Sequence, residues 1–389
     1  MRILRVIASV DPRTGGPDEG IRQINQVMQA MGHVTEVASL DAPDDPWVRE
    51  YPWPIHAVGP FVGSYRYSRR LLPWLRAHAG EFDCTIIHGV WQFSSFGSWL
   101  ALRRADRPYF LYCHGMLDSP WFRRTYPLKH IKKVIYWRLA EHRVLRDARA
   151  VLFTCEEERV LAHQSFRPFR CHGEVVNYGT RGPVGDPEVQ RRSFFERFPA
   201  LSGRRLVLFL GRLHPVKGCD LLIQAFAEVA GDDPSLHLVM VGPDQVGWQA
   251  ELRRQAAAVG IAPRITWTGM LTGDLKWGCF HAADAFILPS HSEGFGLVVT
   301  EALSCGVPTL ITNKVNIWRE VQADGAGFVG DDDRPGTAAI LRRWLACTPQ
   351  QRQDMRRRAR RCFDTRFHIQ KAASSLIRVL RAHGVKDLH

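Results

Sequence analysis

Short apolar runs alternate with amphipathic segments along most of the 389-residue chain. In the first half, the runs that we interpret as buried strands occupy residues 2–10, 34–40, 83–88, 109–113, 150–154 and 173–177. Between the first two lies a segment with apolar residues at helical spacing, from Ile21 to Met31, which ends at Gly32. This alternation predicts a parallel sheet whose strands are connected by helices.

The same alternation is cleaner in the second half. Its predicted strands are residues 205–210, 236–241, 264–268, 284–288 and 308–312, and its predicted helices are residues 218–230, 247–258, 272–282 and 296–305. The two periodic blocks are separated by the Gly- and Pro-rich stretch at 178–183, with a short linker helix predicted at 188–198. We therefore expect an α/β fold of two Rossmann-like, doubly wound domains, residues 1–180 and 181–365.

Composition adds a strongly basic balance. Lys and Arg number 52 against 39 Asp and Glu, a net charge of +13, which indicates an acidic partner such as a nucleotide-sugar, an anionic lipid or a nucleic acid. The nine cysteines are scattered without a C-x-x-C pair, which favours a reducing cytoplasm and neither a disulfide framework nor a zinc site. We find no signal-peptide pattern and no apolar run near the roughly 20 residues of a membrane span, so we expect a cytoplasmic protein.

One stretch in the second block carries two carboxylates around a glycine-rich turn. Glu293 precedes Gly294-Phe295-Gly296, and Glu301 follows about two turns into the predicted helix, on roughly the same side because a turn takes about 3.6 residues. The free N–H groups of a helix start suit a phosphate, and the two carboxylates suit sugar hydroxyls. The alternative is an ordinary strand-to-helix turn with two solvated acids.

A second stretch follows the strand at 205–210. It places Arg212 and Lys217 in a tight loop between Gly211 and Gly218. Two cations in such a loop can neutralise a diphosphate, the arginine with a bidentate fork and the lysine as a point charge. Taken alone, either cation can equally be a solvated surface residue.

Together these motifs resemble the retaining glycosyltransferases of family 4, which have the GT-B fold. The matching residues are Gly211-Arg212-Leu213, Lys217-Gly218, Pro289-Ser290, Glu293-Gly294-Phe295-Gly296, Glu301-Ala302 and Gly306-Val307-Pro308. The match covers about residues 205–330 and is looser in the first half; residues 313–320 depart from the family's usual Gly-Ile-Pro-Glu form. The resemblance implies two domains facing across a cleft, and a final helix at 366–389 that crosses back onto the first domain.

The resemblance also implies roles for individual residues. The catalytic ones are His114, Arg212, Lys217 and Glu293, and those that bind the donor are Gly15, Gly16, Gly211, Met270, Gly294, Phe295, Gly296, Leu297 and Glu301. Arg212, Lys217 and the amides of Gly296 and Leu297 would stabilise the leaving diphosphate in place of a metal. We expect no cofactor: the nucleotide-sugar is a co-substrate, no G-x-G-x-x-G fingerprint supports NAD, and Asp331-Asp332-Asp333 is expected to lie in a loop away from the cleft.

A further partner is suggested by residues 119–146, which are basic and interleaved with aromatic residues such as Trp121 and Trp137. Such a segment can lie on an anionic membrane, so the protein is expected to be cytoplasmic and at most peripheral on the inner face of the plasma membrane. The alternative is a solvated face over an ordinary core, which a buried Trp121 and Trp137 would favour. No nucleic-acid module is recognisable.

The function expected from these features is transfer of a sugar from a UDP- or GDP-sugar to an acceptor hydroxyl with retention of configuration. A glycan linked to polyprenyl diphosphate in surface-polysaccharide assembly is the expected acceptor. The alternatives are another GT-B reaction, by a phosphorylase or a nucleotide-sugar epimerase, and a catalytically silent binder of sugar nucleotides.

Overall fold

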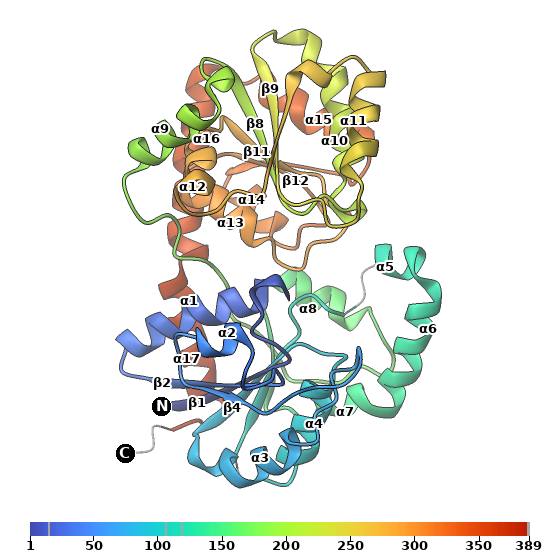
Figure 1. The fold of residues 1–389 in the computed structure, drawn as a ribbon, viewed down its shortest axis with the longest axis vertical. Coiled ribbons are helices and arrows are strands. Elements are labelled where there is room, and N and C mark those ends of the chain that lie inside the picture. The colour runs from blue at the N-terminus through green and yellow to red at the C-terminus, as the bar shows by residue number, and fades with distance from the viewer. Residues whose placement is uncertain (15, 106, 118–119, 387–389) are drawn as a thin grey trace. The chain divides into compact units, whose positions relative to one another are not determined.

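The computed structural model describes residues 1–14, 16–105, 107–117 and 120–386 (Figure 1). They form two compact units: Met1–Gly179 together with Ile369–His389, and Thr180–His368. The sequence predicts boundaries at 180 and 366, and the units of the structure change at 180 and 369. Each unit contains one parallel sheet with helices on both faces.

The first unit is built on a seven-stranded sheet in the order β3-β2-β1-β4-β5-β6-β7. Every neighbouring pair of these strands is parallel. The strands are β1 (Arg2–Ile7), β2 (Val34–Ser39), β3 (Ile55–Ala57), β4 (Cys84–His88), β5 (Tyr109–Tyr112), β6 (Ala150–Phe153) and β7 (Gly173–Val175). The strand order reverses between β1 and β4, and in doubly wound sheets ligands bind beyond the carboxyl ends of the strands at such a point.

The helices of the first unit are α1 (Gly16–Ala30), α2 (Pro46–Arg49), α3 (Leu71–His78), α4 (Phe93–Leu102), α5 (Pro120–Thr125), α6 (Pro127–Tyr136), α7 (His142–Asp147), α8 (Glu156–His163) and α17 (Ile369–Ala382). A π-helix, η3 (Trp137–Glu141), joins α6 to α7, and shorter 3-10 turns are η1 (Pro12–Thr14) and η2 (Ala79–Glu81).

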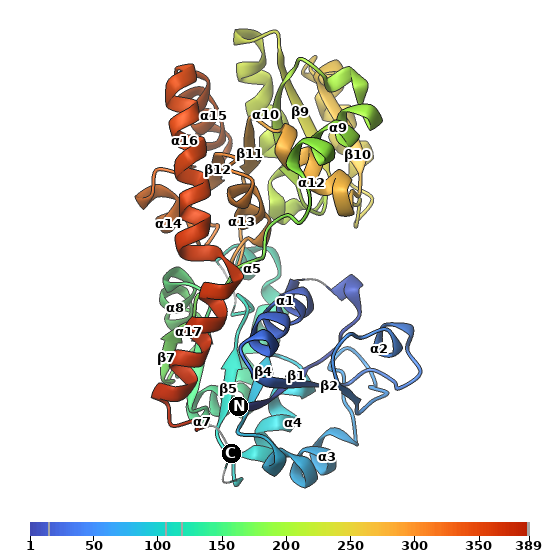
Figure 2. The ribbon, with the colours of Figure 1, turned by 90° about the vertical axis from the view of Figure 1, so that its left-hand side faces the viewer.

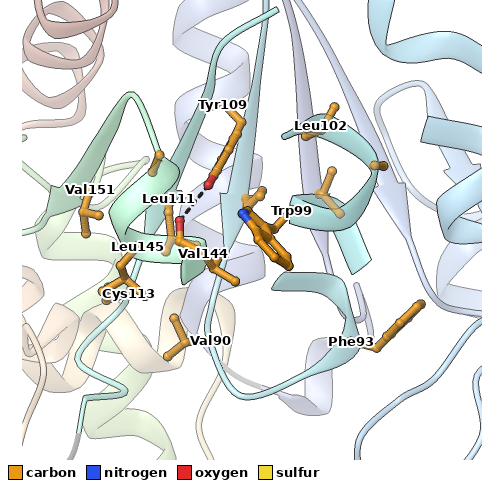
Figure 3. Packing of buried hydrophobic residues seen from close by; sticks show 14 of the residues in the cluster. Val90, Phe93, Trp99, Leu102, Tyr109, Leu111, Cys113, Val144, Leu145 and Val151 are labelled. Carbon is orange, nitrogen blue, oxygen red and sulfur yellow. Dashed lines mark hydrogen bonds between the residues drawn. The ribbon is translucent and has the colours of Figure 1, made fainter. Parts of the chain in front are cut away.

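Two apolar layers cover the faces of this sheet, because successive side chains of a strand point to opposite faces. Leu4 and Val6 of β1 join a core with α3, α4 and α7, part of which Figure 3 shows. In that core the hydroxyl of Tyr109 donates a hydrogen bond to the carbonyl oxygen of Val144, 2.7 Å away, so its one polar atom is satisfied. Ile3 of β1 belongs to the opposite core.

That opposite core is completed by α17, which packs beside α1 (Figure 2). Its buried residues include Ile369, Ala373, Leu376 and Leu380, a helical stripe that contacts apolar residues of β1, β4, β5 and β6. The last helix of the described chain is therefore an integral part of the first unit.

The second unit contains a six-stranded parallel sheet in the order β10-β9-β8-β11-β12-β13. Its strands are β8 (Arg205–Leu210), β9 (Leu236–Val241), β10 (Ile265–Gly269), β11 (Ala285–Leu288), β12 (Thr309–Thr312) and β13 (Gly327–Gly330). Its order reverses between β8 and β11, which brings the ends of these two strands side by side.

The helices of the second unit are α9 (Pro187–Arg197), α10 (Cys219–Val229), α11 (Gln249–Ala258), α12 (Gly273–Ala282), α13 (Leu297–Ser304), α14 (Trp318–Ala323), α15 (Arg334–Leu345) and α16 (Pro349–Cys362). Its shorter turns are η4 (Pro199–Leu201), η5 (Pro215–Lys217), η6 (Ala230–Asp232), η7 (Ala262–Arg264) and the π-helix η8 (Phe363–Phe367).

Two parts of the second unit differ from the sequence-based expectation. Helix α9 is no free linker: it packs on α12 so closely that a Cβ on Gly278 would lie 2.2 Å from the carbonyl oxygen of Gln190. Strand β13 was not predicted, because its four residues, Gly327–Gly330, include two glycines and only one Val and one Phe.

Candidate active site

The loop after β8 holds the two predicted cations. Its 3-10 turn, η5, starts where the ring of His214 accepts a hydrogen bond from the amide of Val216, 3.1 Å away. Lys217 ends the turn. Arg212 is exposed, and its Nη1 donates to Gln245 Oε1 at 2.6 Å. Partial burial, and then the charges of Arg212 and Lys217, lower the pKa of His214.

The loop after β11 leads into α13 as the glycine pattern predicts. Gly296 occupies the N-cap with φ of 87°, a conformation that glycine adopts without strain. A Cβ there would also lie 3.1 Å from Val315. The amides of Gly296 and Leu297 thus stand at the start of the helix. Phe295 is buried with its ring against Phe367, so only its backbone is available to a ligand.

Backbone contacts tie these two loops together. A Cβ on Gly218 would lie 2.1 Å from the carbonyl oxygen of Pro289, so only a glycine allows the approach. The carbonyl oxygen of Val216 accepts hydrogen bonds from the amide of His291 at 2.8 Å and the hydroxyl of Ser290 at 2.9 Å. The loops therefore converge at the carboxyl ends of two adjacent strands.

The convergence brings Lys217 to Glu293. Their side chains form an ion pair with exposures of only 12% and 20%. Gly294 lies between Glu293 and the start of α13, at intermediate burial. The predicted cation, the predicted carboxylate and the helix start thus occupy one place in the second unit.

The second carboxylate, Glu301, lies one turn beyond Leu297 on α13. Lys276 of α12 donates to Glu301 Oε1 at 2.7 Å, an ion pair whose side chains are 26% and 14% exposed. Gly211 lies directly after β8, so close to Gly242 that a Cβ on Gly242 would meet its carbonyl oxygen at 1.9 Å. Met270, after β10, is 69% exposed, and among the described residues no hydrogen bond or ion pair joins it to Lys217, Glu293 or Glu301.

His114 belongs to the first unit, two residues beyond β5. Its φ of 51° is unusual for a residue other than glycine. Its Nε2 lies 2.9 Å from Nδ1 of His88, and the two rings are nearly coplanar. Burial and then the charge of Arg5 lower the pKa of His114 to about 3, so the ring is neutral at physiological pH. Of the predicted glycine pair, Gly16 begins α1, and Gly15 lies outside the described residues.

The aspartate run at 331–333 lies nearer to this cluster than we expected. It follows β13 at the same edge of the sheet, and Asp332 accepts a hydrogen bond from Nδ1 of His291 at 2.9 Å. Asp333 caps α15 instead. Within the residues that the structure describes, no group of three His, Cys, Asp or Glu side chains is arranged to hold a metal ion.

Sequence reasoning missed three contributors to these sites: Lys276, His291 and Arg5. Lys276 reads as an ordinary helix cation, because nothing local marks it as the partner of a residue 25 positions later. Arg5 sits in an apolar strand run, where a charge is unusual, and that was the one available signal. His88 was noticed only for its place at a strand end.

Solved structures with the same architecture define the fold. Sucrose-phosphate synthase from Thermosynechococcus elongatus matches over 98% of both chains with a TM-score of 0.75 and 19% identity. The Anabaena protein HepE, crystallised with UDP and glucose, matches over 98% of this chain and 100% of its own, with a TM-score of 0.76 and 19% identity. Two doubly wound parallel-sheet domains of this kind make the GT-B fold.

Models of glycosyltransferase families match both halves of the chain and show which family it belongs to. Residues 190–362 match the model "Glycosyl transferases group 1", and residues 15–179 match the model "Glycosyl transferase 4-like domain". The D-inositol 3-phosphate glycosyltransferase of Geodermatophilus obscurus is 33% identical over 222 residues, which are 54% of this chain and 48% of that protein. The chain belongs to family 4 of the GT-B glycosyltransferases, and it spans about half the length of the curated relatives it matches.

No helix in the described part of the chain is both long and apolar enough to cross a membrane.

Proposed function

We propose that this protein transfers a sugar from a nucleoside-diphosphate sugar to an acceptor hydroxyl, with retention of anomeric configuration and without a metal ion. The observation that carries the proposal is the meeting of Lys217 and Glu293 at the start of α13, from loops that follow two adjacent strands. A diphosphate held there would face a lysine, a nearby arginine and free helix amides at once. Family membership agrees with this chemistry.

In this mechanism the leaving diphosphate is stabilised by Arg212, Lys217 and the amides of Gly296 and Leu297. These positive groups meet the charge that develops as the bond between sugar and phosphate breaks, so they can take the part of a metal. Glu293 accepts hydrogen bonds from sugar hydroxyls while its carboxylate stays paired with Lys217. In this proposal it acts by orienting the sugar and forms no bond to it.

Glu301 accepts hydrogen bonds from the ribose, with Lys276 holding its carboxylate in place. Gly211, Gly294 and Phe295 contribute backbone, and the segment at Met270 borders the base. From the first unit, we propose that Gly15, Gly16 and His114 contact the donor. UDP is the favoured nucleotide, because the structurally similar HepE was crystallised with UDP-glucose, and GDP is the alternative.

The donor is tested by the thermal stability of the purified protein with UDP, GDP and ADP. A ligand that binds only the folded state at 100 times its Kd adds about 2.7 kcal/mol to the unfolding free energy. We expect one diphosphate to raise the melting temperature and the Lys217→Ala variant to lose that shift. No shift with any of the three would contradict the assignment.

The reaction is tested by incubating the protein with the labelled UDP-sugar that binds. Transfer requires an added acceptor, whereas an epimerase converts the donor alone and a phosphorylase requires phosphate; a silent binder forms no product. Turnover that survives EDTA supports a metal-independent reaction, and NMR of the product anomer tests retention.

For the acceptor, we propose a glycan on a lipid diphosphate, presented at an anionic membrane surface. The support is an exposed apolar stripe along α6 and η3. Leu128, Ile131, Ile135 and Leu139 are 76%, 55%, 56% and 67% exposed. Their spacing puts them on one side of the helix, and the exposed cations Lys129, Lys132 and Arg138 flank them. A helix of this kind lies in a membrane interface.

Trp137, one of the aromatic residues that we expected at a membrane surface, lies in the core instead. Trp137 is buried at 1% exposure and belongs to the core, so it cannot insert into lipid. Lys133 lies over the rings of Trp91 and Phe122, at 4.7 and 4.3 Å from their centroids, and so serves packing within the unit. The proposed contact therefore depends on the aliphatic stripe and its flanking cations.

Cosedimentation with vesicles of phosphatidylglycerol or of phosphatidylcholine tests the surface. We expect binding to the anionic vesicles and its loss in an Ile131→Ser, Ile135→Ser variant. The exposed valines of the second unit, Val246→Ser with Val259→Ser, are the matched control. Equal binding by both variants would contradict the proposed membrane surface. The name of the curated relatives indicates inositol phosphate as their substrate. Transfer to free inositol phosphate by this protein would contradict the lipid-linked acceptor.

A further inference from the structure

A charged side chain lies in the core of the first unit without a counter-ion. Arg5 is 1% exposed at the middle of β1. Its guanidinium donates to Asn25 Oδ1 at 2.8 Å, to His88 Nε2 at 3.2 Å and to Met28 Sδ at 3.2 Å. Among the described residues no carboxylate pairs with it. Burying a charge without a counter-ion lowers the stability of a fold. We therefore expect Arg5 to have a role other than stabilising the core.

Arg5, His88 and His114 form one line across three adjacent strands. β1, β4 and β5 are neighbours in the sheet, and Ile7 of β1 pairs with His88. Alternation puts Arg5, His88 and Tyr112 on the face that α1 and α17 cover. His114 continues this line two residues after Tyr112. Its ring centroid lies 5.2 Å from that of His88, with 18° between the planes, as expected for rings that share an in-plane hydrogen bond.

The hydrogen bonds along this line leave one arrangement of protons. Arginine only donates, so His88 Nε2 must accept, and the proton of the neutral His88 ring is then on Nδ1. That Nδ1–H donates to His114 Nε2, which must also accept. The remaining nitrogen of His114, Nδ1, therefore carries the proton.

We propose that Arg5 and His88 are positioning residues that fix His114 as a neutral imidazole with its proton on Nδ1, ready to donate one hydrogen bond to an oxygen of the bound sugar. Only the identity of that oxygen rests on the proposed function. The hydrogen bonds from Arg5 to His88 and from His88 to His114 lie within the first unit.

The second ring nitrogen of His114, Nδ1, is placed to donate a hydrogen bond to a ligand. The residue is partly exposed at the carboxyl end of β5, and no described protein group is bonded to its Nδ1. Protonation of His114 would place an N–H opposite the N–H of His88. Burial and then the charge of Arg5 keep the pKa of His114 low. A neutral donor with one fixed tautomer costs no reorganisation when a substrate arrives.

The test is the tautomer of His114 in the full chain, read from the two ring ¹⁵N shifts by long-range ¹H–¹⁵N NMR, with His114→Gln to assign the signals. We expect a protonated Nδ1 and an unprotonated Nε2 at neutral pH. A protonated Nε2 in the wild-type protein overturns the proposal without any variant having to fold.

Variants then separate positioning from packing. His88→Phe keeps a ring but cannot donate, and Arg5→Met keeps a long side chain but not the donor; both should release His114 into a mixture of tautomers. His88→Gln can accept from Arg5 and donate to His114, so it should restore the wild-type shifts. Arg2→Met, on the same strand but exposed and paired with Glu36, is the control. An unchanged His114 tautomer in folded His88→Phe and Arg5→Met would refute the positioning role.

If the protein transfers sugar, His88→Phe should lower kcat roughly tenfold, the loss of one hydrogen bond, with KM for the nucleotide-sugar little changed. A kcat equal to that of wild type, with the tautomer lost, would overturn the donation to the sugar. The NMR result is obtained without substrate, so a failure of the transferase assignment is seen separately from a failure of the proton arrangement.

Discussion

Lys217 and Glu293 are 76 positions apart in the chain and form an ion pair in the second unit. The pair joins the loop after β8 to the loop after β11. It can form because Gly218 and Pro289 approach each other without a side chain between them. The cation and the carboxylate that we propose bind the donor are thus in contact with each other.

Removing either loop cation should abolish most turnover. We expect Lys217→Ala and Arg212→Ala each to lower kcat by roughly 10²–10³, the usual cost of one positioned donor at a developing negative charge. The exposed Lys371→Ala on α17 should have wild-type kinetics. Steady-state assays with matched far-UV circular dichroism measure this. Near-normal turnover in a folded Lys217→Ala protein would remove the basis of the mechanism.

Gly218→Ala should cost more stability than positive φ alone explains. Gly203 and Gly218 have φ of 74° and 66°, but only Gly218 has backbone within reach of a Cβ, at 2.1 Å from Pro289 O. We expect Gly203→Ala to lose about 1 kcal/mol of unfolding free energy, and Gly218→Ala roughly 2 kcal/mol more together with its affinity for the nucleoside diphosphate. Urea unfolding and calorimetry of both variants provide the comparison. Equal losses would indicate that the approach of the two loops relaxes readily.

Glu301→Gln should weaken nucleotide binding while leaving the fold intact. A charged acceptor contributes more to a hydrogen bond than a neutral amide does, so we expect a Kd for the nucleoside diphosphate raised by roughly tenfold or more. Glu251→Gln of α11, whose side chain is 41% exposed and pairs with Arg254, controls for loss of a paired negative charge. Isothermal titration calorimetry measures both. If Glu301→Gln binds as tightly as wild type, the carboxylate has only its structural role with Lys276.

The contribution of Glu141 to stability should fall as pH rises from about 4.5 to 7, against the rising contribution of the buried, neutral His114. This residue of η3 is fully buried, and burial raises its pKa from 4.5 to about 7. In that window the folded protein keeps a proton that the unfolded chain has lost, so its contribution is complete below pH 4.5 and disappears through pH 7. The upper bound on the loss is about 3 kcal/mol.

Glu141→Gln should remove this falling contribution from the pH dependence, since an amide does not titrate. Urea unfolding of wild type and variant at pH 5, 6, 7 and 8 provides the measurement, and Glu50→Gln, which removes an exposed carboxylate of the same unit, should leave the wild-type slope. A slope that Glu141→Gln shares with wild type would show that other groups set the pH dependence.

Much of the second unit was predictable, because its strands are continuous apolar runs and its helices have clear periodicity. β8 and β9 have the predicted bounds. The convergence of the loops at Lys217 and Glu293 followed from the rule that ligands gather at strand ends. β13 was missed because glycine replaces the β-branched residues that mark a strand. The linker helix α9 was missed as a packed element because its contacts lie on α12, far along the chain.

The line from Arg5 to His114 could not be predicted, for a different reason. Arg5 and His88 lie in different strands and His114 follows a third, and only the strand order brings β1, β4 and β5 side by side. Sequence periodicity predicts which face a residue occupies, not which strand is its neighbour. The aliphatic stripe of α6 is a similar case, since Ile131 and Ile135 read as core until their exposure is known.

Helix α17 determines the order in which the two units can finish folding during synthesis. The second unit is complete at His368, but the first unit, although it is synthesised first, lacks one wall of its core until Ile369–Ala382 has left the ribosome. The earliest part of the polypeptide must therefore wait, with the apolar surface of β1, β4 and β5 open, while the later part folds. Chaperone dependence and sensitivity to protease during translation should be concentrated in the amino-terminal half.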